Sequence, residues 1–300
     1  MRTTLISGAS GLIGSALVAH LRGRGERVVT LVRRQPRAED EIRWDPRGGD
    51  LPADAMKGAD VVVNLSGAGI GDRRWTESRK EEILNSRLQT TGLLAKAIAA
   101  AERPPPVFLS ASAIGIYGQD RGDELLEEDS ATGDDFLARV TVEWEAATAP
   151  AEAAGTRVVL FRTGLVLTGS GGLLGPLLPL FKIGLGGKIG SGNQWMSWIS
   201  IDDEVGALVH LMDSSVSGPV NLVAPHPVTN AEFTNALAKT LGRPAFLRIP
   251  RLALYVRLGR EMAEGTALSS QRVRSDRLSS AGFEFFHSDL ETALRQVLDH

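Results

Sequence analysis

The 300-residue sequence contains no cysteine and only two tyrosines, Tyr117 and Tyr255. Without cysteine the chain can form neither a disulfide nor a thiolate metal site. Its five histidines are scattered without the spacing of a metal-binding motif, so we expect no bound metal. No charge-free and glycine-free apolar run reaches the length of about 18 residues that a membrane-spanning helix needs.

The chain also lacks an excess of positive charge, because 33 lysines and arginines stand against 36 acidic residues and the formal net charge is −3. Nucleic acids and anionic membranes attract proteins with a surplus of basic residues, so we expect neither as the main partner. The N-terminal stretch TTLISGASGLIGSALVAHL has the apolar character of a leader, but its regularly spaced glycines favour a folded segment. We therefore expect a cytoplasmic protein, either a monomer or a homodimer, with a small-molecule substrate.

Short apolar runs alternate with amphipathic stretches in the first half of the sequence. This alternation predicts an α/β protein with a doubly wound parallel sheet, the Rossmann fold. We expect three helices to begin at caps: Ser78 with Glu81 in a capping box, Asp134 or Asp135, and Asp202. Thr229 with Glu232 predicts a second capping box. The segment rich in Gly, Leu and Pro after Arg162 predicts a loop and a short helix that cover the crevice of the sheet.

The glycine-rich stretch ISGASGLIG lies between the first expected strand and the first expected helix. Gly8 and Gly11 allow the backbone to turn tightly and approach a pyrophosphate, and Gly14 allows the helix to pack close to the sheet. Ser10, Leu12 and Ile13 complete the turn. Glycine-rich turns also occur for steric reasons alone, but the position after a first strand favours a dinucleotide site.

The end of the second expected strand indicates which dinucleotide is bound. Enzymes that use NAD usually have Asp or Glu there to hold the ribose 2′-hydroxyl. This sequence has Arg33 and Arg34 instead, and a guanidinium group binds a 2′-phosphate. Two solvated arginines at a strand end are the alternative, but together with the glycine-rich turn they favour NADP(H) as the cofactor.

Five segments in order resemble the extended short-chain dehydrogenases/reductases, the group of the nucleotide-sugar epimerases: GASGLIG, NLSGAGI, SASAIGIYG, the strand ending in Arg162, and WISIDDEVGAL. RWTESRKEEILNSRL, GLGGKIGSGNQWMSWI, APHPVTNAEF and SSAGFEFFHSDLETAL resemble an atypical epimerase-like family with a short C-terminal domain of unknown function. The resemblance covers nearly the whole chain. It implies an oxidoreductase or epimerase-like enzyme.

The resemblance also implies roles for particular residues. Ser110 would lie near the cofactor, and Arg162 with the backbone to Leu165 would lie beside the nicotinamide. Arg87 would face the cofactor, held by Glu82, although a surface pair between these two residues is the alternative. The end of the fourth strand would line the adenine and ribose through Leu65, Ser66, Gly67 and Ala68.

The catalytic pattern departs from that group. Ser112 matches the serine that orients the substrate oxygen, but the positions of the usual Tyr-x-x-x-Lys pair fall on Phe136 and Val140. Three hypotheses remain. Tyr117 supplies the proton, with Arg121, Arg139 or the nicotinamide charge lowering its pKa. Alternatively substrate or water supplies it and Ser112 only orients, or the protein binds NADP(H) without turnover as a regulator or sensor.

Opposite this site we expect a group of substrate-binding residues that suit a flat or sugar-like ligand: Asn193, Gln194, Trp195 and Trp198. The alternative is that the two tryptophans anchor the apolar loop on the core. We assign residues 1–165, completed by about 200–224, to the NADP-binding domain. Residues 166–199 and 225–300 form the substrate-side lobe, with a small C-terminal domain at about 248–298.

Overall fold

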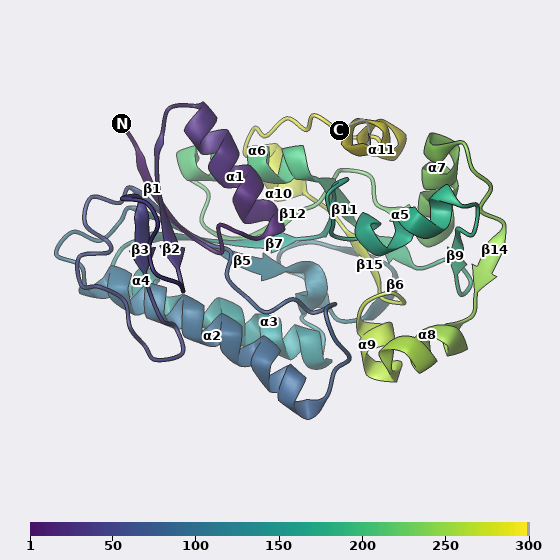
Figure 1. Cartoon of the computed structure of the whole chain (residues 1–300), viewed down its shortest axis with the longest axis horizontal. Helices are drawn as coiled ribbons and strands as arrows, with labels where there is room; N and C mark the ends of the chain where they lie inside the picture. Colours follow the sequence, from purple (N-terminus) through teal and green to yellow (C-terminus); the bar gives the residue numbers. More distant parts are fainter. Residues whose placement is uncertain (299–300) are drawn as a thin grey trace.

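The computed structural model describes residues 1–298, and a seven-stranded sheet forms its centre (Figure 1). The strand order is β12-β7-β5-β4-β1-β2-β3, and all neighbouring strands are parallel. Its strands are β1 (Thr3–Ser7), β2 (Arg27–Val32), β3 (Glu41–Arg43), β4 (Val61–Asn64), β5 (Val107–Ala113), β7 (Arg157–Thr163) and β12 (Gly218–Leu222). The predicted doubly wound parallel sheet is confirmed. The strand order reverses between β1 and β4, where such sheets bind ligands.

Helices cover both faces of this sheet (Figure 1). On one face lie α1 (Leu12–Gly23), α6 (Ile201–Asp213) and α10 (Asp276–Ser280). On the other face lie α2 (Glu77–Ala100), α3 (Phe136–Ala146) and α4 (Ala149–Ala153). The segment after Asp135 forms the two helices α3 and α4, because the chain leaves the helix at Ala147 and restarts before Pro150.

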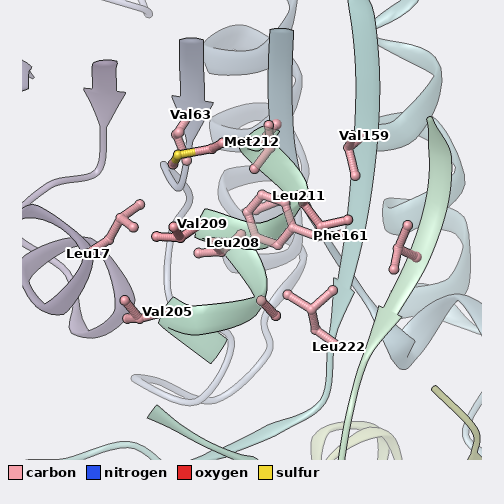
Figure 2. Packing of buried hydrophobic residues seen from close by; sticks show 14 of the residues in the cluster. Leu17, Val63, Val159, Phe161, Val205, Leu208, Val209, Leu211, Met212 and Leu222 are labelled. Carbon is pink, nitrogen blue, oxygen red and sulfur yellow. The ribbon is translucent and has the colours of Figure 1, made fainter. Parts of the chain in front are cut away.

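The largest core cluster fills the space between the sheet and the face covered by α1 and α6. Figure 2 shows Leu17 of α1 and Leu208 of α6 turned toward Val63, Phe161 and Leu222 of the strands. All five side chains are fully buried. Their burial fixes α1 and α6 against the sheet, and it thereby fixes the loops at the carboxyl ends of the strands.

Four two-stranded sheets and five helices form the part of the chain beyond the carboxyl ends of the central strands. The sheets pair β6 with β15, β8 with β11, β9 with β14 and β10 with β13. Their bounds are β6 (Asp120–Leu126), β8 (Leu165–Leu167), β9 (Gly187–Ile189), β10 (Trp195–Met196), β11 (Trp198–Ser200), β13 (Val228–Thr229), β14 (Leu247–Ile249) and β15 (Ser270–Val273). The helices are α5 (Leu174–Lys182), α7 (Asn230–Leu241), α8 (Arg251–Leu258), α9 (Arg260–Gly265) and α11 (Leu290–Leu298). The segment after Arg162 therefore contains several short strands besides the expected helix.

Two predicted helix caps are wrong and two are confirmed. Helix α2 begins two residues earlier than expected, with Thr76 rather than Ser78 as its cap. Ser200 caps α6, because its hydroxyl accepts the N–H of Asp203, and Asp202 lies within the first turn. Asp135 caps α3, and Thr229 with Glu232 forms the predicted capping box.

Candidate active site and cofactor site

The turn between β1 and α1 is shaped by two glycines. Gly8 has a φ of +73°, and a Cβ on this residue would lie 2.6 Å from the carbonyl carbon of Leu65. A Cβ on Gly14 would lie 2.3 Å from the carbonyl oxygen of Gly8. Only glycine fits at these positions, so the turn is tight and α1 packs directly against it.

The first turn of α1 is open to a ligand. Gly11 is the N-cap and offers no side chain to the free N–H groups of the helix. Ser10 and Gly11 are exposed, while Leu12 and Ile13 are half-buried. Free amides at an accessible helix start bind phosphate groups. The residues therefore fit the pyrophosphate predicted from the sequence.

The two arginines after β2 differ in their surroundings. Arg34 donates to both carboxylate oxygens of Glu41, at 2.7 and 2.6 Å, and these bonds lower the pKa of Glu41 to about 2. Arg33 is exposed, and its side chain has no hydrogen bond or ion pair within the described residues. Of the two, Arg33 is thus the guanidinium group left available for a ligand phosphate.

The loop from Leu65 to Ala68 continues from β4 along the same edge of the sheet. Asn64 accepts hydrogen bonds from the Ser7 hydroxyl, at 2.7 Å, and from the Ser66 N–H, at 3.2 Å. The N–H of Ala68 donates to the Ser86 hydroxyl of α2 at 2.9 Å. These bonds hold the loop next to the glycine-rich turn.

Arg87 is a half-buried cation on α2 beside this loop. Its guanidinium donates to the carbonyl oxygens of Ala68 and Ile83, both at 3.0 Å, and lies 4.8 Å from the ring centre of Trp144. A Cβ on Gly67 would lie 3.3 Å from the Arg87 guanidinium carbon. Burial lowers the pKa of Arg87 to about 10. It forms no ion pair with any carboxylate in residues 1–298, which suits a group that meets an anionic ligand.

Glu82, which we expected to hold Arg87, has a different partner. Its carboxylate forms an ion pair with Arg79 at 2.6 Å, and Arg47 lies 3.8 Å away. The bond from Arg79 lowers the pKa of Glu82. The expected pair between Glu82 and Arg87 is therefore wrong, because Arg79 lies one helical turn before Glu82 and reaches it first.

A buried polar network joins the ends of β5, β7 and β12. The Ser112 hydroxyl donates to Glu145 of α3, and Glu145 forms two bonds with Arg162, at 2.8 and 2.9 Å. Arg162 also donates to the Tyr117 hydroxyl at 3.0 Å. That hydroxyl in turn donates to Asn221 at 2.7 Å. The structure thus brings the predicted site residues Ser112, Tyr117 and Arg162 together in one network.

Tyr117 is fully buried, and this changes its chemistry. Burial raises the pKa of its phenol, and the opposing effect of Arg162 is smaller. Arg121 donates to the backbone carbonyl of Tyr117 rather than to its hydroxyl, and Arg139 donates to the carbonyl of Asp134. The expected lowering of the Tyr117 pKa by Arg121 or Arg139 is therefore wrong.

Ser110 and the two substituted positions of the Tyr-x-x-x-Lys pair flank this network. Ser110 is buried in β5 opposite Asn64, two residues before Ser112 and so on the same side of the strand. Phe136 begins α3 and packs edge-on against Trp75, with ring centres 5.1 Å apart. Val140 is buried. Neither Phe136 nor Val140 carries an exchangeable side-chain proton.

The backbone after Arg162 leaves the central sheet and continues into β8. Leu165 begins β8, and its N–H donates to the carbonyl oxygen of Ser197 at 2.8 Å. A Cβ on Gly164 would lie 2.5 Å from that same oxygen. The segment from Arg162 to Leu165 is therefore held rigidly next to the end of β5.

A polar pocket of about 580 Å³ contains three of the four predicted substrate residues: Asn193, Gln194 and Trp195. The Trp195 indole N–H donates to Asp123 at 2.8 Å, and the Arg272 guanidinium lies 4.4 Å from its ring centre. Arg248 and Arg251 also line the pocket. The pocket thus offers amides, carboxylates and guanidinium groups to a polar ligand.

Trp198 does not belong to this pocket. It is fully buried in the second core cluster, and its indole N–H donates to the carbonyl oxygen of His226 at 3.0 Å. The prediction that Trp198 binds substrate is therefore wrong. Trp198 therefore anchors the segment on the core.

Four polar residues of this region, two buried and two half-buried, were missed by sequence reasoning. Glu145 and Asn221 belong to the network, and Glu128 accepts the N–H of Asn221 at 2.9 Å. Glu204 is fully buried, accepts a bond from Thr163 at 2.7 Å, and has its pKa raised to about 8 by burial. In the sequence, Arg162 alone could have indicated these acidic residues, because an arginine expected in a buried strand requires an acid nearby.

Residues 1–298 show neither a metal site nor a membrane-spanning helix. They contain no group of three or more side chains placed to hold a metal ion. No helix among them has the length and apolar character needed to cross a membrane.

A parallel sheet with an open glycine-rich turn at its switch point and a serine at the end of β5 defines a dinucleotide-binding protein of the short-chain dehydrogenase/reductase class. The chain belongs to the NAD dependent epimerase/dehydratase family, whose sequence pattern matches residues 4–223. Residues 249–297 match a second pattern, a domain of unknown function called DUF1731.

Relatives cover nearly the full chain. An epimerase family protein of Mycobacterium leprae is 45% identical over 290 residues, which are 96% of this chain and 93% of the relative. The human epimerase family protein SDR39U1 is 39% identical over 298 residues, 98% and 99% of the two chains. A crystal structure of that human protein with NADPH matches with a TM-score of 0.91, 37% identity, and 99% of each chain covered.

Proposed function

We propose that the protein is an NADP(H)-dependent oxidoreductase or epimerase-like enzyme that acts on a small polar substrate. The observation that carries this proposal is Arg33, exposed and unpaired directly after β2, beside an open glycine-rich turn. A guanidinium in that position binds a 2′-phosphate, and an acidic residue that would hold a 2′-hydroxyl is absent there. The NADPH in the human relative's structure supports the same cofactor.

The cofactor would extend along the carboxyl edge of the sheet. The turn from Gly8 to Gly14 would bind the pyrophosphate, and the loop from Leu65 to Ala68 would line the adenosine. Arg87, without a carboxylate partner in residues 1–298, would face the negatively charged part of the molecule. Ser110 and the backbone from Arg162 to Leu165 would border the nicotinamide, which supplies or accepts a hydride when bound.

We infer that Ser112 orients the reacting oxygen of the substrate. Its proton is directed to Glu145, so the oxygen lone pairs are free to accept a hydrogen bond from a substrate hydroxyl. During oxidation the substrate proton would pass to Ser112, while the proton of Ser112 passes to Glu145. Reduction would follow the reverse route. Tyr117 holds Arg162 in position instead of supplying the proton, because burial raises its pKa.

The polar pocket around Trp195 would hold the part of the substrate that does not react. The amides of Asn193 and Gln194 suit hydroxyl groups, as in a sugar-like ligand. The cofactor would then bind to residues 1–165 and 200–224, and the substrate to residues 166–199 and 225–300. We also infer a cytoplasmic monomer or homodimer, which cell fractionation and light scattering would test.

The proposal is tested with NADPH carrying deuterium at the reactive carbon, mixed with an extract of small metabolites. We expect deuterium in at least one metabolite, formed with the wild-type protein and about 100-fold more slowly with Ser112→Ala. Tyr117→Phe should retain more activity than Ser112→Ala, since it keeps the ring and loses only its bonds to Arg162 and Asn221.

The second candidate function is a sensor that binds NADP(H) without turnover. It is favoured by Phe136 and Val140, which replace the usual acid and its partner. If wild-type protein binds NADPH tightly but neither transfers deuterium to any metabolite nor epimerises one, this function replaces the first.

A further inference from the structure

One surface of the molecule combines exposed apolar side chains with positive charge. We call it the α5–α8 face and define it as residues 180–188 and 243–257. It includes the end of α5, β9, β14 and most of α8, which lie along one edge of the molecule (Figure 1). The two segments are adjacent because β9 pairs with β14. A Cβ on Gly184 would also touch Pro244, at 3.6 Å.

The α5–α8 face carries most of the apolar side chains that the protein exposes. Of the 11 large hydrophobic residues exposed among residues 1–298, seven lie on this face: Leu180, Ile183, Leu185, Phe246, Leu247, Leu252 and Val256. Ile183 is 68% exposed and Phe246 is 80% exposed. A concentration of this kind marks an interaction site rather than the ordinary scatter of surface apolar residues.

The charge of the α5–α8 face is opposite to that of the remaining protein. The face has six basic residues and no acidic residue: Lys182, Lys188, Arg243, Arg248, Arg251 and Arg257. Its formal charge of +6 leaves −9 on the rest of a chain whose net charge is −3. None of the six forms an ion pair within residues 1–298, so their charge is available to a partner. The net charge of the whole sequence concealed this separation.

Helix α8 has the character of a helix that lies on a surface. None of its residues is buried. Leu252 and Val256, one turn apart, are 70% and 72% exposed and form an outward stripe, with Arg251 and Arg257 beside them. Helices with apolar and basic side chains arranged in this way lie in the plane of a membrane interface.

The charge also argues against a second copy as the partner. A symmetric dimer through this face would place two sets of six positive charges against each other. The strongly exposed apolar side chains project outward, and none of them lines the pocket around Trp195. Projecting apolar groups surrounded by arginine fit the boundary between anionic headgroups and acyl chains.

We propose that the α5–α8 face binds peripherally to a bilayer that contains anionic lipids. Phe246, Leu252, Val256 and Ile183 enter the interface, and the surrounding basic residues bind headgroup phosphates. Arg248 and Arg251 belong both to this face and to the polar pocket. Docking therefore places the mouth of the pocket next to the lipid headgroups. This binding does not depend on catalytic activity.

The test is sedimentation of the full chain with vesicles of phosphatidylcholine, alone or mixed with phosphatidylglycerol. We expect binding to the mixed vesicles only, weakened by salt. Arg243→Gln combined with Arg257→Gln should reduce the partition coefficient about 30-fold, since each interfacial charge contributes about fivefold. Phe246→Ser combined with Val256→Ser should reduce it to a similar degree.

Matched controls lie far from the face. Arg27→Gln removes an exposed charge at the start of β2, and Val142→Ser removes an exposed apolar residue of α3. Both should leave partitioning unchanged. The proposal is overturned if folded wild-type protein, verified by NADPH binding, does not bind the mixed vesicles. It is also overturned if the control variants lose binding equally, or if the face proves to hold a second copy or an acidic protein.

Discussion

The ion pair of Glu145 and Arg162 lies at the centre of the polar network at the ends of β5 and β7. Their side chains are only 12% and 7% exposed, and they connect Ser112 to Tyr117. A buried pair of this kind is costly to break from one side, because the remaining ion stays buried without its counter-charge. The network is therefore important for stability as well as for orienting Ser112.

Glu145→Ala should lower the free energy of unfolding by about 3–5 kcal/mol, because it leaves the Arg162 guanidinium buried and unpaired. Urea denaturation followed by circular dichroism measures the change. Glu143→Ala, two residues earlier and exposed, should change the free energy by less than about 0.5 kcal/mol. Equal losses for the two variants would show that the pair has no special contribution.

Glu204 should make the protein less stable as the pH rises. Burial raises its folded-state pKa to about 8, above the ordinary value of 4.5. Between these values the folded chain binds a proton that the unfolded chain releases, so the free energy of unfolding falls with pH, by at most about 1.4 kcal/mol per unit. Below the unfolded pKa both states are protonated and the dependence from this group disappears.

The comparison with Glu204→Gln isolates this contribution. Urea denaturation at several pH values from 5 to 8 should show a variant whose advantage over the wild type grows with pH. If the two stability profiles stay parallel across that range, the carboxyl group does not remain protonated in the folded protein.

Some properties of single residues could be predicted from the sequence and others could not. The glycine-rich turn was predictable, because its spacing reflects a local steric requirement of Gly8 and Gly14. The partner of Arg87 was not, because Arg79 competes for Glu82 and that choice depends on side-chain placement. The raised pKa of Tyr117 could not be predicted either, since the end of a strand is exposed or buried depending on which later segments of the chain cover it.

Among the helices, the starting points test local reasoning most directly. Thr76 accepts the N–H of Arg79, so it satisfies a free donor at the start of α2. Thr76→Ala should cost about 1 kcal/mol of unfolding free energy. Ser78→Ala should have almost no effect, although sequence reasoning had placed the cap there. A larger loss for Ser78→Ala in denaturant titrations would contradict the observed start of α2.

Most central strands were predictable because they are apolar runs, and β4 is buried throughout. The edge strand β3 was not predicted, because its three residues include Glu41 and Arg43 and none of them is buried. The short strands outside the central sheet were not predicted either. β10 has two residues and β8, β9 and β14 have three each, which is too short for a periodic pattern. Their pairing joins segments far apart in sequence, such as Gly187 with Leu247. Tertiary packing decides such pairs. The composition of the segment after Arg162 therefore predicted only a loop and a short helix.

At the scale of the whole chain, the net charge of −3 hides the basic α5–α8 face, because its positive charge is concentrated in residues 180–188 and 243–257. A ligand that binds the folded state more tightly than the unfolded state raises the free energy of unfolding. NADPH at 100 times its dissociation constant should therefore raise the free energy of unfolding by about 2.7 kcal/mol. Thermal unfolding with and without the dinucleotide measures this, and an unchanged melting temperature would argue against a preformed site.

Isothermal titration calorimetry with NADPH and NADH tests whether Arg33 binds the 2′-phosphate of NADP(H). The wild-type protein should bind NADPH more tightly than NADH. Arg33→Ala should weaken NADPH binding about 10- to 100-fold and leave NADH binding unchanged. Arg34→Ala should weaken it far less, because Arg34 is held by Glu41. Equal affinities of the wild-type protein for the two dinucleotides, or an unchanged NADPH affinity in Arg33→Ala, would show that Arg33 does not bind the 2′-phosphate.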